Sequence, residues 1–177
     1  MDFIVETSAR HIHLTDAAIE ALYGPGATLG VKKMLSQPGQ FACTNDKIKL
    51  VGPKGELMVS VLGPARKACQ VELSFTDART LGLKDVPVRE SGDVAGTPGI
   101  HLVGPAGELD IAEGCIIAKR HVHMTPADAA AFGVTNGLNL TRTFRSLRSG
   151  YSDAMYISNQ RLRRRRSSLR IGLMVSS

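Results

Sequence analysis

Two histidine pairs are the residues best suited to chemistry in this chain of 177 residues. His11 and His13 lie in a segment of pattern Arg-His-x-His-x-Thr, and the same pattern returns at His121 and His123. In a β-strand, residues i and i+2 point to the same face, roughly 7 Å apart. Each pair can therefore converge on one ion, and neutral imidazole is a favoured zinc ligand. The repeat of the whole pattern makes two zinc sites the leading interpretation.

A third ligand is suggested by a unit that occurs three times along the chain: a strand, a threonine that begins a helix, and a short helix. The threonines are Thr15, Thr76 and Thr125, and four positions before them lie His11, Glu72 and His121. A carboxylate beside two histidines leaves one zinc position open for substrate, which is typical of a catalytic site. We therefore predict Glu72 as a zinc ligand.

Three arginines lie close to these motifs in the sequence. Arg66 precedes Glu72 by six residues, and Arg10 and Arg120 directly precede the histidine pairs. A guanidinium group binds phosphate or carboxylate through two parallel hydrogen bonds. Arg66 is thus either an anion ligand or a surface residue. Arg10 and Arg120 either bind an anionic substrate or pair with an acid.

The remaining histidine and the cysteines receive simpler interpretations. His101 lies in an alternating segment, and we expect a solvated strand residue. The three cysteines are far apart, which does not suit a disulfide framework and favours the cytoplasm. They are interpreted as core thiols, and only Cys69 is a candidate nucleophile.

Alternating apolar residues and glycine-rich turns predict a mainly β fold with short helices. Residues 48–57 and 100–109 share a Gly-Pro-x-Gly turn between apolar segments, which is typical of a β-hairpin. The two copies suggest two similar β-rich modules. Residues 69–75 alternate as a strand, and helices are expected after Thr15, Thr76 and Thr125.

Basic charge is concentrated at the end of the chain. Residues 142–177 hold nine arginines, no lysine and a single acid, whereas acids outnumber bases in the rest of the chain. Binding of nucleic acid is therefore expected only through this Arg-rich tail. No apolar run approaches the roughly 20 residues of a membrane helix, so no membrane association is expected.

The motifs, in their order along residues 4–137, resemble those of PduL-type phosphate acyltransferases (phosphate propanoyltransferases), a bacterial family. The matching segments are 8–15, 63–66, 70–78, 90–93 and 116–126. The resemblance implies two small β-barrels, each capped by short α-helices and related as an internal repeat, with a two-zinc site between them. The first barrel would span 10–117, and an incomplete second barrel would combine 1–9 with 118–141.

The resemblance also implies roles for individual residues. His11, His13 and Glu72 would hold one zinc, His121 and His123 would hold the other, and Arg66 would bind phosphate. The reaction would interconvert short-chain acyl-CoA (propanoyl-CoA or acetyl-CoA) plus phosphate with acyl-phosphate plus CoA, by zinc-assisted direct attack of phosphate on the thioester.

Two other functions remain open. A two-zinc hydrolase would attack the same thioester with zinc-bound hydroxide. A non-catalytic, zinc-stabilised barrel would bind a polyanion through the Arg-rich tail. Homo-oligomers and residence in a bacterial microcompartment are compatible with the resemblance, although the chain has few residues before Ser8 for an encapsulation extension.

The family pattern ends in a strand that carries a further zinc-ligand histidine, and this chain has no histidine after His123. Residues 142–177 also lack the alternating apolar pattern of a barrel strand, so no regular strand is expected there. We interpret this aberrant tail as an out-of-frame version of the last barrel strands, with a basic extension as the alternative. In either case the second zinc site is expected to be weakened.

Overall fold

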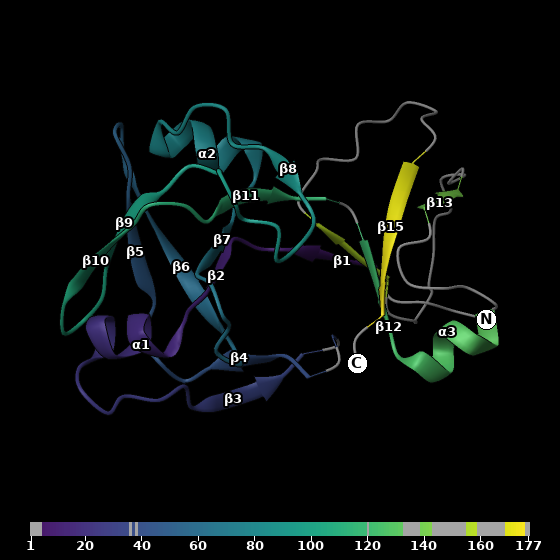
Figure 1. Ribbon diagram of the computed structural model, residues 1–177, viewed down its shortest axis with the longest axis horizontal. Helices are drawn as coiled ribbons and strands as arrows, with labels where there is room; N and C mark the ends of the chain where they lie inside the picture. Colours follow the sequence, from purple (N-terminus) through teal and green to yellow (C-terminus); the bar gives the residue numbers. More distant parts are fainter. Residues whose placement is uncertain are drawn as a thin grey trace. The chain divides into compact units, whose positions relative to one another are not determined.

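The computed structural model describes residues 5–35, 37, 39–119, 121–132, 139–142, 155–158 and 169–175 (Figure 1). The chain divides into two compact units. The large unit comprises Ala9–Leu35 and Gln40–Ala118, and the small unit comprises Met1–Ser8, Ser36–Gly39 and Lys119–Ser177. The first histidine pair belongs to the large unit and the second to the small unit.

A curled ten-stranded sheet forms the large unit (Figure 1). Its strands are β2 (His11–His13), β3 (Val31–Met34), β4 (Phe41–Cys43), β5 (Ile48–Val51), β6 (Glu56–Gly63), β7 (Gln70–Glu72), β8 (Val88–Arg89), β9 (Ile100–Val103), β10 (Glu108–Ile111) and β11 (Cys115–Ala118). The main order is β10-β9-β5-β6-β2-β7-β11-β8, and β4 joins β6 and carries β3. The predicted mainly β class with short helices is confirmed.

The two predicted hairpins are present, but both lie in the large unit. Strands β5 and β6 flank the first Gly-Pro turn, and β9 and β10 flank the second. The hairpins pair directly with each other, with Leu50 opposite Leu102 at the centre of β5 and β9. Both hairpins fall within residues 10–117, the range of the first predicted barrel, and the inference of two similar modules stays a prediction. Each hairpin buries its apolar face and protects one edge strand by pairing with the other.

Helix α1 (Asp16–Tyr23) begins where the sequence predicts. The side-chain oxygen of Thr15 accepts a hydrogen bond from the backbone of Ala18 at 3.1 Å, which satisfies one of the unpaired amides of the first turn. The helix ends at Gly24, whose φ of 102° favours glycine. Its start is thus fixed within three residues of His13.

Helix α2 (Phe75–Leu81) begins earlier than predicted. Ser74, not Thr76, is the capping residue, because its hydroxyl accepts from the Asp77 amide while the Asp77 carboxylate accepts from the Ser74 amide. Thr76 has Arg79 three residues later and cannot form this reciprocal capping box. Phe75 is accordingly the first helical residue and 49% exposed, rather than a core residue of a longer strand.

The helices and hairpins of the large unit are joined by backbone hydrogen bonds. The turn of the second hairpin donates from Ala106 to the carbonyl of Leu22, at the end of α1. The turn of the first hairpin donates from Lys54 to the carbonyl of Leu81, at the end of α2. The end of α1 is therefore held by the second hairpin, and the end of α2 by the first.

The hydrophobic core of the large unit lies between these elements. Strands β2, β5, β7 and β9 each contribute a fully buried residue, and both helices contribute a leucine from their last turn. These residues are Ile12, Leu50, Val71, Leu102, Leu22 and Leu81. The core thus holds β2 and β7, the two strands that carry His11, His13 and Glu72.

The small unit contains two groups of described strands and helix α3 (Pro126–Phe132). Strands β1 (Val5–Ser8) and β14 (Met155–Ser158) pair in parallel. Strand β15 (Leu169–Val175) lies between β12 (His121–Met124) and β13 (Asn139–Arg142). Helix α3 begins at Pro126, as predicted.

Two segments of the Arg-rich tail form strands, which corrects our reading of its pattern. In β15, Leu169, Ile171, Leu173 and Val175 alternate with Arg170, Gly172 and Met174. This period of two is the pattern of a strand with one apolar face, and the high arginine content of the tail obscures it. The two-barrel repeat and the assignment of 142–177 as an aberrant tail stay predictions.

Within the part of the chain that the structure describes, no helix has the length and apolarity needed to cross a membrane.

The close packing of the first hairpin turn against the end of α2 predicts an effect on the stability of the fold. A Cβ atom at Gly52 would meet the carbonyl oxygen of Leu81, which is backbone and cannot move aside. We expect Gly52→Ala to lower the free energy of unfolding by about 1–3 kcal/mol, measured by urea denaturation. Pro53→Ala is the control in the same turn, with an expected loss below about 1 kcal/mol. Equal effects of the two substitutions would contradict this packing.

Candidate metal centre

The candidate site is built on the antiparallel pair formed by β2 and β7. The pairing sets three pairs of residues opposite each other: His11 and Glu72, Ile12 and Val71, and His13 and Gln70. The middle pair lies in the hydrophobic core. Because side chains alternate along a strand, the two outer pairs share the other face.

His11, His13 and Glu72 come together on this face. Their potential ligand atoms all lie within 4.8 Å of one another. The side chains are buried, and the two imidazole rings meet edge to face with centroids 5.1 Å apart. Two nitrogens and a carboxylate oxygen form a donor set that suits zinc. The residues therefore fit the predicted metal, and their role as ligands stays a prediction.

Backbone carbonyls fix the orientation of both rings. Nδ1 of His11 lies 2.8 Å from the carbonyl of Ala9, and Nδ1 of His13 lies 3.1 Å from the carbonyl of Leu62. Since a carbonyl can only accept, Nδ1 carries the proton when each ring is neutral, and Nε2 is then the nitrogen with the lone pair. This arrangement is common for histidines that bind metals.

The two imidazoles differ in their electrostatic surroundings. Burial lowers the pKa of His13 to about 3, with help from the charges of Arg66 and His11. Burial also lowers the pKa of His11, but the charge and hydrogen bond of Glu72 outweigh it and leave that pKa above its usual value. His13 is therefore neutral at neutral pH, as a zinc ligand must be.

Glu72 is held from two sides. Its Oε1 accepts a hydrogen bond of 2.7 Å from Nε2 of Gln70, and its Oε2 lies 3.5 Å from Nε2 of His11. The two carboxylate oxygens thus face different partners, and Oε2 is the one directed toward the histidines.

Arg66 lies next to this cluster, in the loop between β6 and β7. Its backbone amide donates to the carbonyl of Leu14 at 2.8 Å, and its Nη1 donates to the hydroxyl of Ser91 at 3.1 Å. Burial lowers the pKa of Arg66, and the opposite charge of Glu72 counteracts this effect. A guanidinium ion that is partly withdrawn from water binds an anion more strongly than a solvated one.

Gln70, Ser91 and Gly92 are functional candidates that sequence analysis did not single out. Gln70 donates to both Glu72 and Ser91, and its carbonyl oxygen accepts from the Gly92 amide. The alternation of residues 69–75 already placed Gln70 on the same face as Glu72, which was the available signal. The contact of Gln70 with residues 91–92 joins segments about twenty residues apart, so no local pattern in the sequence indicates it.

Glu72 lies close to His11 and His13, but its alignment with His11 and His121 by position is wrong. That alignment depended on Thr76 as the capping residue of α2, whereas Ser74 takes that place. Counted from the true caps, Glu72 corresponds to His13 and Gln70 corresponds to His11. The two strands thus contribute equivalent positions to one site.

The second histidine pair has similar local geometry on β12 of the small unit. The rings of His121 and His123 are 4.7 Å apart, and Nδ1 of His121 lies 2.6 Å from the carbonyl of Lys119. The positions opposite them on β15 are Gly172 and Met174. By residue type, neither glycine nor methionine carries a side chain that zinc prefers as a ligand.

The arginines beside the histidine pairs differ in what the structure describes. Nη1 of Arg10 lies 2.7 Å from a carboxylate oxygen of Asp77, and its Nε donates to the carbonyl of Met58. Arg10 thus pairs with an acid, the second of its two predicted alternatives, and we leave it out of the proposed substrate site. Arg120 lies outside the described residues.

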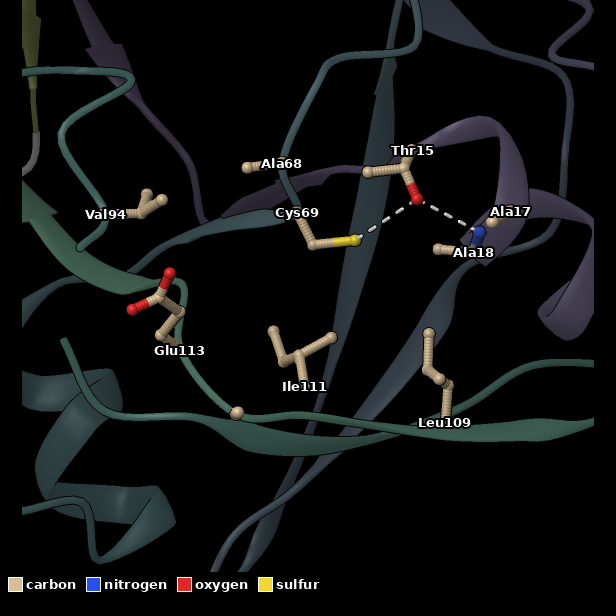
Figure 2. A pocket seen from close by; sticks show the side chains of 10 residues that line it. Thr15, Ala17, Ala18, Ala68, Cys69, Val94, Leu109, Ile111 and Glu113 are labelled. Carbon is tan, nitrogen blue, oxygen red and sulfur yellow. Dashed lines mark hydrogen bonds between the residues drawn. The ribbon is translucent and has the colours of Figure 1, made fainter. Parts of the chain in front are cut away.

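Cys69 lies in a separate pocket of about 350 Å³, which is lined mainly by small and apolar side chains (Figure 2). Its sulfur lies 4.0 Å from the hydroxyl of Thr15. The described lining contains no histidine that could act as a base, and the carboxylate of Glu113 accepts a hydrogen bond from Gly96. This environment does not activate a thiol for nucleophilic attack.

His101 is outside the candidate site. Its Nδ1 lies 2.8 Å from a carboxylate oxygen of Asp110 on the neighbouring strand, and its side chain is 30% exposed. The hydrogen bond and charge of Asp110 raise the pKa of His101. His101 is thus a partly solvated strand residue.

Comparison with known proteins matches this chain to one family over most of its length. The family model described as phosphate propanoyltransferase matches residues 4–164. The chain belongs to the phosphate propanoyltransferase family. The matched range includes both histidine pairs, Arg66 and Glu72.

Relatives from several bacteria support this membership. Phosphate propanoyltransferases from Listeria monocytogenes, Shewanella putrefaciens and Thermotoga maritima are 54%, 51% and 52% identical to this chain. The alignments cover 71%, 73% and 74% of this chain. They cover 58%, 61% and 62% of the relatives, so the chain spans less than two thirds of their length.

The geometry of the large unit predicts where zinc binds. We expect purified protein to contain zinc, and His11→Ala or His13→Ala to remove at least half of it, because each substitution deletes one of three ligands. Elemental analysis of dialysed protein measures this. His101→Ala is the matched control, since it removes a histidine outside the cluster and should leave the zinc content unchanged. Full zinc content in both site variants would contradict the assignment.

Proposed function

We propose that this chain is a phosphate acyltransferase that interconverts short-chain acyl-CoA and phosphate with acyl-phosphate and CoA. The observation that carries the proposal is the buried group of His11, His13 and Glu72 beside the partly buried Arg66, in a chain that belongs to the phosphate propanoyltransferase family. A cationic anchor beside a metal-binding group is what a phosphate nucleophile and an anionic CoA thioester require.

One zinc ion is assigned to His11, His13 and Glu72. When bound, zinc supplies a Lewis acid that polarises a substrate oxygen and offsets negative charge. A second zinc is assigned to His121 and His123. We expect it to bind more weakly, because β15 places Gly172 and Met174 beside that pair.

Arg66 is assigned to phosphate. Its guanidinium can form parallel charge-assisted hydrogen bonds to two phosphate oxygens, which orients a third oxygen for attack. The hydroxyl of Ser91 fixes one side of the guanidinium at 3.1 Å. Because the group is already oriented and partly desolvated, little of its binding energy is lost in ordering.

The covalent step is direct transfer of the acyl group. A phosphate oxygen forms a bond to the thioester carbon, the carbon–sulfur bond breaks, and CoA departs as a thiolate with the bonding electron pair. The surroundings of Cys69 support this route over a covalent acyl-enzyme, since no imidazole is among the described residues that line its pocket. His11, His13 and Glu72 are themselves buried, which would limit the access of bulk water to a metal ion held by them.

A phosphate-dependence assay tests this function and separates it from thioester hydrolysis. We expect release of CoA from propanoyl-CoA or acetyl-CoA to require phosphate. Arg66→Ala removes a charge-assisted contact worth about 1.5–3 kcal/mol, which corresponds to a rise of roughly tenfold to hundredfold in the KM for phosphate. The KM for acyl-CoA should change much less.

The neighbouring Lys67 provides the control, since its side chain is exposed and carries the same charge. Lys67→Ala should leave both KM values near those of the unmodified protein. CoA release without phosphate would favour a hydrolase, and equal effects of Arg66→Ala on both KM values would argue against a phosphate-binding role. Zinc-containing protein with no turnover would favour the non-catalytic barrel.

A further inference from the structure

Gln70 is a buried side chain beside the candidate metal centre that forms three hydrogen bonds through its amide. It is 1% exposed, and its amide contacts three groups. Nε2 donates to Oε1 of Glu72 at 2.7 Å and to the hydroxyl of Ser91 at 2.9 Å, and Oε1 accepts from the Gly92 amide at 2.6 Å. Its side-chain amide thus links a candidate metal ligand on β7 with the loop at residues 91–92.

The orientation of this amide is determined by its partners. The Gly92 amide can only donate, so it must face the carbonyl oxygen of Gln70. Nε2 then faces Glu72, and its two N–H groups are used by Glu72 and Ser91. A flipped amide would set a carbonyl oxygen against the Glu72 carboxylate, which is repulsive. The side chain therefore has one favourable orientation.

We propose that Gln70 is a positioning residue for both parts of the site, an inference that rests on the proposed function for its kinetic consequence. By holding Oε1 of Glu72, it presents Oε2 toward His11, which lies 3.5 Å away. Glu72 then offers a metal one oxygen rather than two, so a coordination position stays open for substrate. Through Ser91, the same amide also fixes the hydroxyl that receives the hydrogen bond from Arg66.

The equivalence of the two strands explains why an amide stands at this position. Gln70 corresponds to His11 when both strands are counted from their helix caps, and it lies opposite His13 in the pairing of β2 with β7. A third imidazole here would compete to become a fourth protein ligand and close the site. An amide is neutral, has both donors and an acceptor, and orients a ligand without entering the coordination sphere.

Two substitutions test this role. Gln70→Met keeps the length of the side chain but removes every donor and acceptor. Gln70→Glu keeps the shape and the acceptor for Gly92, but sets a second carboxylate against Glu72. It also keeps the test open if the methionine variant does not fold. Circular dichroism and the melting temperature report folding of both variants.

The first readout is zinc affinity, measured by competition with a chromophoric chelator and independent of turnover. Loss of such an outer partner of a ligand typically weakens metal binding by about 10- to 100-fold, and we expect a loss in this range for each folded variant. The second readout is kinetic. The KM for phosphate should rise at least about fivefold, because the Arg66 guanidinium is no longer held in its orientation through Ser91. The KM for acyl-CoA should change less.

Thr97→Val is the matched control for a purely structural effect. Thr97 is 4% exposed and donates to the carbonyl of Val94 while accepting from the Gly114 amide. Its loss should lower the melting temperature but leave zinc affinity and both KM values unchanged. Equal zinc losses in this control and in the Gln70 variants would overturn the positioning role.

The outcomes separate the inference from the proposed function. Unchanged zinc affinity in a folded Gln70 variant overturns the role toward Glu72, whether or not the protein turns over. Weakened zinc binding with an unchanged KM for phosphate retains that role and overturns the link to Arg66. Absence of phosphate-dependent CoA release in the unmodified protein overturns the proposed function, while the zinc measurement still decides the role of Gln70.

Discussion

The structure of the candidate site depends on the antiparallel pairing of β2 with β7. Ile12 and Val71 meet at the centre of this pair and are completely buried. Because side chains alternate, burial of these two residues forces the flanking polar residues onto the opposite face. A shift of β2 by one residue in register would turn His11 and His13 into the apolar core, where their polar groups would lose hydrogen bonds.

The rest of the large unit keeps this register in place. Helices α1 and α2 start three residues after the ends of β2 and β7, and each is held at its end by a hydrogen bond from a hairpin turn. Buried polar groups are costly unless they are paired. Here the Ala9 and Leu62 carbonyls, Gln70 and the Gly92 amide supply partners. The site is therefore preorganised before any substrate arrives.

Local signals in the sequence predicted much of this arrangement. The hairpins, the start of α1 and the two histidine pairs all depend on residues within ten positions of one another. The pairing of β5 with β9 and the contact of Gln70 with Gly92 join distant segments and have no local signature. The error at α2 arose because Thr76 and Ser74 both suit a cap, and only the reciprocal bonds with Asp77 decide between them. The strand at 169–175 was missed because arginines obscured its alternation.

The most direct test of the site is the identity of the atoms around the metal. X-ray absorption at the zinc edge can be measured on protein in which His121 and His123 are both replaced by alanine and one equivalent of zinc is added. The account predicts nitrogen and oxygen neighbours at about 2.0–2.2 Å, with the outer-shell signature of two imidazoles and no sulfur. Sulfur neighbours near about 2.3 Å, or a spectrum without imidazole, would contradict it.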